Sequence, residues 1–114
     1  MITHHTERTT ERTERKAGGE GYTLLESLLT PENRGEHCRL FSHVTLEAHC
    51  SLGYHEHHGE SETYYILAGH GCYNDNGTLV DVGPGDVTHT PSGSGHALAN
   101  TGDTPLEFVA LILA

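Results

Sequence analysis

The sequence predicts an all-β domain, built either as a sandwich or as a barrel. From Tyr22 onward it consists of short extended runs, separated by turn signals at intervals of about 8–12 residues, which is typical of these folds. Asn76 and Gly77 stand between two runs and indicate a tight hairpin, because both residue types tolerate positive φ. A helix would fit only residues 22–32, where Pro31 limits it. At 114 residues, the chain has the length of one domain.

Nine strands are expected, in the order in which the extended runs follow one another. The main breaks between them are TPENRGE, NDNG, GPGD, PSGSG and TGDTP, which are rich in turn-forming residues. The expected strands cover residues 22–29, 37–47, 50–55, 62–68, 70–74, 78–82, 86–90, 96–101 and 105–113.

The last run, LEFVALILA, is apolar on both faces after Glu107. One set of alternating side chains can fill the interior of the domain: Leu106, Phe108, Ala110 and Ile112. The opposite set then needs a second cover: Val109, Leu111 and Leu113. A second copy of the chain is the simplest cover, so we expect a homodimer.

Residues 1–17 are expected to form a disordered polar tail, and residues 18–114 the folded domain. The tail repeats Thr-Glu-Arg three times and has no apolar residue between Ile2 and Ala17, so it has nothing to bury. Its alternative role is that of a docking tail. The glycine-rich segment 17–21 is expected to be a hinge.

The charge of the chain excludes several partners. The net charge is -10, and residues 17–114 hold thirteen acidic side chains against only Arg34 and Arg39. Such a surface repels phosphate backbones and anionic membranes, so neither nucleic acid nor a membrane is an expected partner.

The expected location is the cytoplasm. No apolar run approaches the length of a membrane span, and the polar N-terminus has no apolar signal segment. Cys38, Cys50 and Cys72 are odd in number and irregular in spacing, so we expect reduced thiols.

Histidines and acidic residues crowd the stretch LGYHEHHGESETYY, and alternation brings some of them onto one face. His55 and His57 point the same way along one strand, and Glu62 shares its face with Tyr64 on the next. Two imidazoles and a carboxylate can therefore converge from adjacent antiparallel strands. His96 can add a fourth group from across a closed barrel.

Two motifs resemble those of the cupin family. The first runs from His55 through His57 and Glu62 to Gly69, with one, four and six residues between them. The second covers residues 85–100 without a gap, as Gly85, Pro91, Gly93, His96 and Asn100 at intervals of five, one, two and three residues. The resemblance covers residues 20–114 and implies a double-stranded β-helix, or jelly-roll, barrel. It departs at His49, where the first motif usually has a glycine, so the turn before the first histidine strand is expected to differ locally.

By this resemblance, His55, His57, Glu62 and His96 bind one divalent metal ion. Imidazole suits zinc, copper, iron or nickel, and a carboxylate extends the choice to manganese. The resemblance favours manganese or iron in function, while purified protein can carry nickel or zinc. Positions left open on the ion would admit a small acid, dioxygen or water.

The leading functional hypothesis is a metal-dependent enzyme that acts on a small oxygen-rich or carboxylate substrate, by oxalate-type or dioxygenase-type chemistry. Its class, whether oxidoreductase, decarboxylase or isomerase, stays open, because this fold hosts many chemistries. The alternative is a non-catalytic metal-binding or small-molecule-binding module, such as a sensor. A structural, storage-type barrel is a third reading, which the complete set of four ligands disfavours.

Candidates for the remaining roles follow from position. Glu60, Tyr64 and His89 are the acid–base candidates, although Glu60 can instead lie in solvent and His89 on the strand surface. Tyr64 and Arg39 are the candidates for substrate binding. Tyr64 can equally be a core residue, and Arg39 can form a salt bridge on the outer surface.

Overall fold

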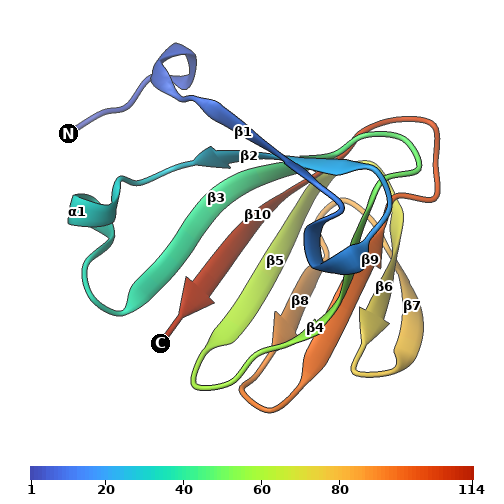
Figure 1. Ribbon diagram of the computed structural model, residues 1–114. Coiled ribbons are helices and arrows are strands. Elements are labelled where there is room, and N and C mark those ends of the chain that lie inside the picture. Colours follow the sequence, from blue (N-terminus) through green and yellow to red (C-terminus); the bar gives the residue numbers. More distant parts are fainter.

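A computed structural model describes residues 1–114 as ten strands in two antiparallel sheets (Figure 1). The sheets have the strand orders β1-β2-β3-β10-β5-β8 and β4-β9-β6-β7. The strands are β1 Thr10–Glu14, β2 Tyr22–Ser27, β3 Cys38–Leu46, β4 Ser51–Glu56, β5 Ser61–Ala68, β6 Gly71–Asp75, β7 Thr78–Val82, β8 Val87–Thr90, β9 Gly95–Ala99 and β10 Leu106–Leu113. The helical elements are η1 His5–Glu7, η2 Lys16–Gly18 and α1 Pro31–Arg34.

The nine strands expected from the sequence are β2 to β10, and their ends differ from the expected ones by at most two residues. The break at 30–36 contains α1, which begins at Pro31, where the missing N–H is not needed. None of the helices has the length and apolar character of a membrane span.

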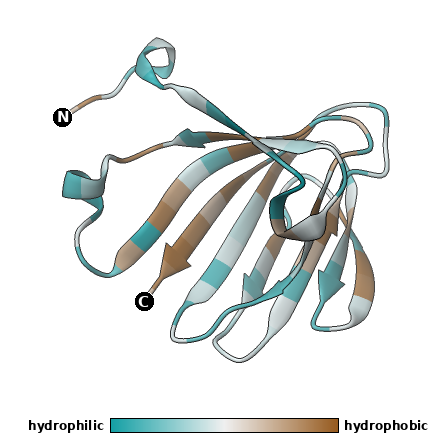
Figure 2. Ribbon diagram, in the orientation of Figure 1, coloured by the Kyte–Doolittle hydropathy of each residue, from teal (hydrophilic) through white to brown (hydrophobic).

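The core lies between the two sheets, and β10 supplies its centre. This strand pairs with β3 on one side and β5 on the other. Leu106, Phe108 and Ala110 are buried, as predicted, whereas Leu113 on the opposite face is exposed. Figure 2 shows β10 as a largely hydrophobic ribbon beside β3, in which hydrophobic and hydrophilic bands alternate. Alternation along the strands thus places one apolar face of the larger sheet inside the barrel.

The N-terminal segment differs from the expected disordered tail, because residues 10–14 form the edge strand β1. This strand pairs with β2 along its whole length, although all of its side chains are exposed. The Arg12 guanidinium lies 3.7 Å from the centre of the Tyr22 ring, and Arg8 Nε lies 3.3 Å from a Glu26 carboxylate oxygen. Backbone pairing at a sheet edge needs no buried side chain, so the absence of an apolar face did not imply disorder.

The expected hinge at 17–21 is docked onto β4. Gly19 and Gly53 approach so closely that a Cβ on Gly19 would clash with the Ser51 carbonyl, and one on Gly53 with the Ala17 carbonyl. The Ser51 N–H also donates to the Glu20 carbonyl at 2.9 Å. These contacts hold η2 against the strand that carries His55.

Candidate metal centre

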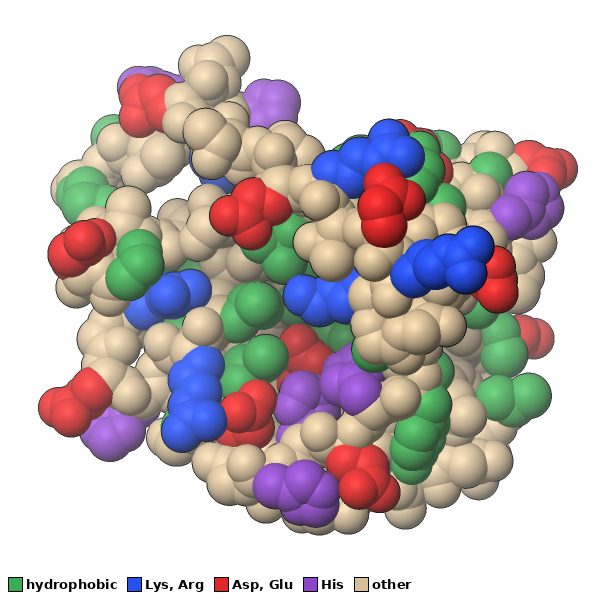
Figure 3. Space-filling view, in the orientation of Figure 1, with side chains coloured by type: hydrophobic (Ala, Val, Ile, Leu, Met, Phe, Trp, Pro, Cys, Tyr) green, Lys and Arg blue, Asp and Glu red, His purple; other side chains and the backbone are tan.

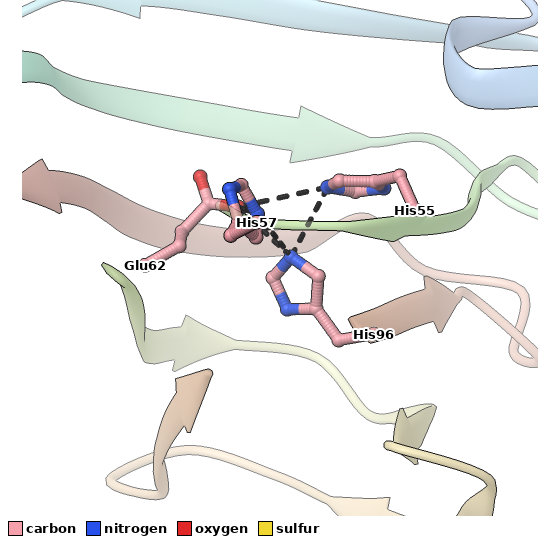
Figure 4. A group of neighbouring side chains, drawn as sticks. All are labelled: His55, His57, Glu62 and His96. Atoms are coloured by element: carbon pink, nitrogen blue, oxygen red, sulfur yellow. Dashed lines mark hydrogen bonds and ion pairs between the residues drawn. The ribbon is translucent and has the colours of Figure 1, made fainter. Parts of the chain in front are cut away.

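Both sheets contribute to a cluster of His55, His57, Glu62 and His96 (Figure 4). His55 on β4 and His96 on β9 are directly opposite each other on paired strands. Glu62 lies on β5, in the other sheet, and faces them across the barrel. The expectation that β4 and β5 are adjacent strands is therefore wrong, because alternation indicates a face but does not identify the neighbouring strand.

The loop before β9 holds His57 just beyond the end of β4. The His57 N–H donates to the Ser94 carbonyl at 3.0 Å, and the Gly93 N–H donates to the His57 carbonyl at 2.7 Å. Gly93 has φ of +91°, which glycine adopts without strain. The loop that contains Pro91 and Gly93 therefore positions His57 as well as His96, which follows it.

The four donor atoms converge on a common point. The Nε2 atom of His96 lies 3.1 Å from Nε2 of both His55 and His57. Glu62 Oε1 lies 2.9 Å from His96 Nε2, 3.0 Å from His57 Nε2 and 3.8 Å from His55 Nε2. Ions such as zinc bind nitrogen and oxygen at about 2.0–2.2 Å, so donors around one ion lie about 3 to 3.5 Å apart. The spacing therefore fits a single metal ion.

The other ring nitrogen of each histidine has its own partner. Nδ1 lies 2.8 Å from the Gly53 carbonyl in His55, 3.1 Å from Glu60 Oε2 in His57, and 2.8 Å from the Tyr73 hydroxyl in His96. These partners favour tautomers that carry the proton on Nδ1, which leaves each Nε2 lone pair free toward the common point. Histidines that bind metals almost always have such a partner on the other nitrogen.

Burial and charge at the cluster also favour a cation. His96, His57 and Glu62 are almost fully buried, and His55 is half-buried. Burial raises the pKa of the Glu62 carboxyl, but hydrogen bonds with His55 and His96 outweigh it and lower the pKa to about 2. Burial lowers the pKa of His96, whereas the hydrogen bond with Glu62 raises the pKa of His55. A buried carboxylate with three imidazole rings around it is a set of groups that a divalent ion would satisfy.

A cavity of about 200 Å³ lies above the cluster. His55, His57 and Glu62 form its polar end, and most of the remaining wall is apolar. Figure 3 shows the opening as a hollow with histidine and acidic side chains on its floor and basic side chains around it. The other lining residues are Lys16, Thr23, Leu25, Leu40, Val44, Leu52, Tyr64, Phe108, Ala110 and Ile112.

Tyr64 lines this cavity next to the cluster. Its ring stacks on His96 with 4.9 Å between ring centres, and its hydroxyl donates to Glu62 Oε1 at 3.3 Å. Burial raises the pKa of the Tyr64 phenol well above its usual value, so the hydroxyl keeps its proton. Both sequence interpretations of Tyr64 apply, because it is a core residue that also faces the site.

Glu60 and Arg39 lie beside the cluster but do not line the cavity. Glu60 is not free in solvent: Oε2 accepts from His57, and Oε1 lies 2.8 Å from Arg39 Nη1. Arg39 is thus in the surface salt bridge that was its alternative role, with its side chain 57% exposed. The structure places both residues as supports of His57, rather than as groups facing a ligand.

His89 is exposed on the outer side of β8, where Nδ1 lies 2.9 Å from the Thr63 hydroxyl. Its neighbours Thr88 and Thr90 point inward instead. The structure therefore places His89 in its alternative position on the strand surface, because alternation along β8 directs it away from the cavity at the cluster.

Two residues of the site were missed from the sequence. The Tyr73 hydroxyl supports His96 and also forms a hydrogen bond with the Thr90 hydroxyl at 2.7 Å. The available signal was alternation along β6, which places Tyr73 on the buried face of that strand. Lys16 lines the cavity from η2, in the segment expected to be disordered.

Two positions of the cupin motifs have a structural role. His49 adopts φ of +64°, as a glycine would. The Asn100 side chain closes a turn by donating hydrogen bonds to three backbone carbonyls.

The barrel and its three-histidine, one-glutamate cluster define the class of protein: the chain belongs to the cupin family, whose cupin-domain model (Cupin_2) matches residues 42–112. Its similarity extends further to an oxalate-binding protein of Thermotoga maritima, with 42% identity over 113 residues that cover 99% of this chain and 93% of the relative. A crystal structure of a predicted oxalate decarboxylase from Thermotoga maritima superposes with a TM-score of 0.95 and 42% identity, covering 99% of this chain and 98% of that one. The polyketide cyclase RemF from Streptomyces resistomycificus shares the fold, with a TM-score of 0.81, 20% identity, and coverage of 99% and 78%.

Proposed function

We propose that this protein binds a small, oxygen-rich carboxylate of the oxalate class at a metal ion held by His55, His57, Glu62 and His96. The observation that carries the proposal is the convergence of three Nε2 atoms and one carboxylate oxygen, while every Nδ1 atom is engaged elsewhere. Such a set brings four potential ligands of one ion to a common point.

The ion proposed for function is manganese or iron, since three imidazoles and one carboxylate suit both. Nickel or zinc can replace them in purified protein, because affinity for nitrogen ligands rises toward those metals. When bound, the ion supplies a Lewis acid that polarises a ligand oxygen. The protein supplies the buried, mostly apolar surroundings that strengthen this interaction.

The charge of the centre favours a carboxylate ligand. Neutral imidazoles add no charge and Glu62 adds one negative charge, so a divalent ion leaves the centre with one net positive charge. Elsewhere the chain is strongly acidic, with a net charge of -10. The centre is therefore a local positive site on a negative protein. The oxalate-binding relative, 42% identical along nearly the whole chain, supports the choice of ligand class.

Catalysis on that ligand, as oxalate-type or dioxygenase-type chemistry, is the second candidate function. Tyr64 favours it, because a protonated phenol faces the cavity beside Glu62 and can hold or donate a proton there. Glu60 is tied to His57 and Arg39, so it is a positioning residue and not the general acid.

Calorimetry of oxalate binding tests the main proposal. Protein loaded with manganese should bind oxalate, and chelator-treated protein should not. A His57→Ala, His96→Ala double variant should bind neither metal nor oxalate. Oxalate affinity that is unchanged after metal removal would contradict the proposal. Product assays on the loaded protein, with and without dioxygen, then separate catalysis from binding: turnover that a Tyr64→Phe variant loses would establish the second candidate.

We also propose a homodimer through the outer face of the larger sheet. Val109 and Leu111 are only half-buried there, and Tyr65, Val87 and Leu113 are exposed. Light scattering should report twice the chain mass, and a Leu111→Glu variant should reduce it to one chain. A wild-type monomer at micromolar concentration would refute this assignment.

A further inference from the structure

A second hollow lies next to the cavity at the metal centre, toward the N-terminal side of the barrel. Three residues line both spaces, namely Lys16, Leu25 and Leu40. The second hollow, the outer groove, has a volume of about 340 Å³. It lies between β1, β2, α1 and β3, and its remaining lining residues are Thr9, Glu11, Ser27, Pro31, Arg34 and Ser42. The two spaces are therefore neighbours that meet at Lys16, Leu25 and Leu40.

Alternation along β3 places the two spaces one after the other along the same face of the strand. Val44, Ser42 and Leu40 follow one another on the inward face of the strand. Val44 lines only the inner cavity, Ser42 only the outer groove, and Leu40 lines both. The inner cavity thus contains the polar metal centre, the outer groove is a second polar region, and Leu25 and Leu40 form the apolar surface that the two spaces share.

The outer groove carries unpaired positive charge. Of the six basic side chains, Arg8, Arg12 and Arg39 are in ion pairs with carboxylates. The other three, Arg15, Lys16 and Arg34, have no carboxylate within ion-pair distance, and of these Lys16 and Arg34 line the outer groove. Glu11 is the one carboxylate among the lining residues, which leaves the groove with a net positive charge in a strongly acidic chain.

Arg34 has a further unusual feature. Its Nε atom is buried and has no hydrogen-bond partner in the protein. A buried donor without a partner in the protein is destabilising, and a water, an ion or a ligand is then its partner. Guanidinium groups recognise carboxylates through two parallel hydrogen bonds, so an acidic group is the chemistry that fits this position.

We propose that the natural ligand is a diacid longer than oxalate. One carboxylate binds at the metal centre, an aliphatic middle part lies against Leu25 and Leu40, and the second carboxylate lies between Lys16 and Arg34. This inference rests on the proposed function, because it takes the metal-bound carboxylate as the first anchor. It assigns ligand selectivity to Arg34, which lines only the outer groove, together with Lys16, which lines both spaces.

The test measures binding of a series of dicarboxylates to manganese-loaded protein by calorimetry. The probes are oxalate, glutarate, adipate and pimelate, each longer diacid being compared with the monocarboxylate of equal carbon number. At least one longer diacid should bind about tenfold more tightly than its monocarboxylate, since charge-assisted hydrogen bonds are the strong ones. Arg34→Gln should reduce this margin about tenfold, while oxalate affinity changes less than about twofold, because Arg34 lines only the outer groove. Lys16→Met should reduce the affinity for the longer diacid about threefold to tenfold.

Arg15→Gln is the matched control, because Arg15 is exposed, precedes Lys16 in the same turn and lines neither space. It should leave every affinity unchanged. Oxalate binding without any preference for a longer diacid, or a preference that both variants retain, would overturn this inference and leave the proposed function intact. If the loaded protein binds a long diacid through Lys16 and Arg34 but not oxalate, the inference holds and the oxalate class is wrong. Binding of no carboxylate at all would refute both.

Discussion

Replacing Tyr73 by phenylalanine should weaken metal binding although Tyr73 is not a metal ligand. Its hydroxyl lies 2.8 Å from His96 Nδ1 and 2.7 Å from Thr90 Oγ1, and the residue is only 3% exposed. Without the hydroxyl, a buried Nδ1–H loses its acceptor, and the tautomer that frees Nε2 loses its support. Loss of such an outer partner lowers metal affinity by about 10- to 100-fold. An unsatisfied buried donor also costs about 1–3 kcal/mol of stability.

The assay is a metal titration against a competing chelator, with melting curves on the metal-free protein. The variant should melt at least about 4 °C below wild type, because about 1 kcal/mol shifts a small domain by about 4–8 °C. Tyr65→Phe is the control: Tyr65 lies on β5 in the other sheet, faces outward and is 48% exposed, so neither quantity should change. Metal affinity of Tyr73→Phe within twofold of wild type would refute the claim that the hydroxyl orients His96.

Three further predictions follow from the fold and the site. Metal affinity should fall steeply below about pH 6, since ordinary histidine titrates near 6.5. Melting curves recorded with metal and with chelator between about pH 5 and 8 should therefore converge on acidification. A constant separation between the two curves would contradict histidine ligation. Glu62 itself should contribute a constant stabilisation to the metal-free protein between about pH 5 and 8. Its carboxyl pKa is lowered to about 2, so the stabilisation is complete at pH values above the ordinary carboxyl pKa and is lost only as the pH falls toward about 2. Deleting residues 1–15 should lower the melting temperature by no more than about 8 °C, because the side chains of β1 are all exposed; a larger drop in calorimetry would show that β1 stabilises the core. Gly53→Ala should destabilise the fold by about 1–3 kcal/mol, since a Cβ there meets the Ala17 carbonyl, and should weaken metal binding, since the Gly53 carbonyl accepts a hydrogen bond from His55. Urea unfolding and metal titration measure the two effects. Gly102→Ala is the control and should cause neither effect, because a Cβ on Gly102 makes only an ordinary contact with Asn100.

The strands and the four clustered residues could be predicted from the sequence because both depend on local patterns. Alternation marks which face of a strand is buried, and the turn residues mark where each strand ends. The spacing of His55, His57 and Glu62 therefore indicated a shared site. The partner of each strand is set by contacts between distant segments, which explains why β4 and β5 were expected to pair, although His55 lies opposite His96 instead.

Other features escaped prediction for different physical reasons. The side chains of β1 gave no signal, because an edge strand is held by backbone hydrogen bonds that do not depend on sequence polarity. The role of Glu60 required the fold of the loop that turns it toward His57. Lys16 became part of the cavity wall only through the close contact of Gly19 with β4, which no periodicity encodes.

The most direct measurement of the central claim is an anomalous-scattering map from crystals grown with manganese. The proposed centre requires one peak between the sheets, bonded to Nε2 of His55, His57 and His96 and to a Glu62 carboxylate oxygen at roughly 2.0–2.3 Å. The same crystals of the His57→Ala, His96→Ala variant should show no peak there. A wild-type ion held by other side chains, or an equally strong peak in the variant, would contradict the assignment of the metal centre.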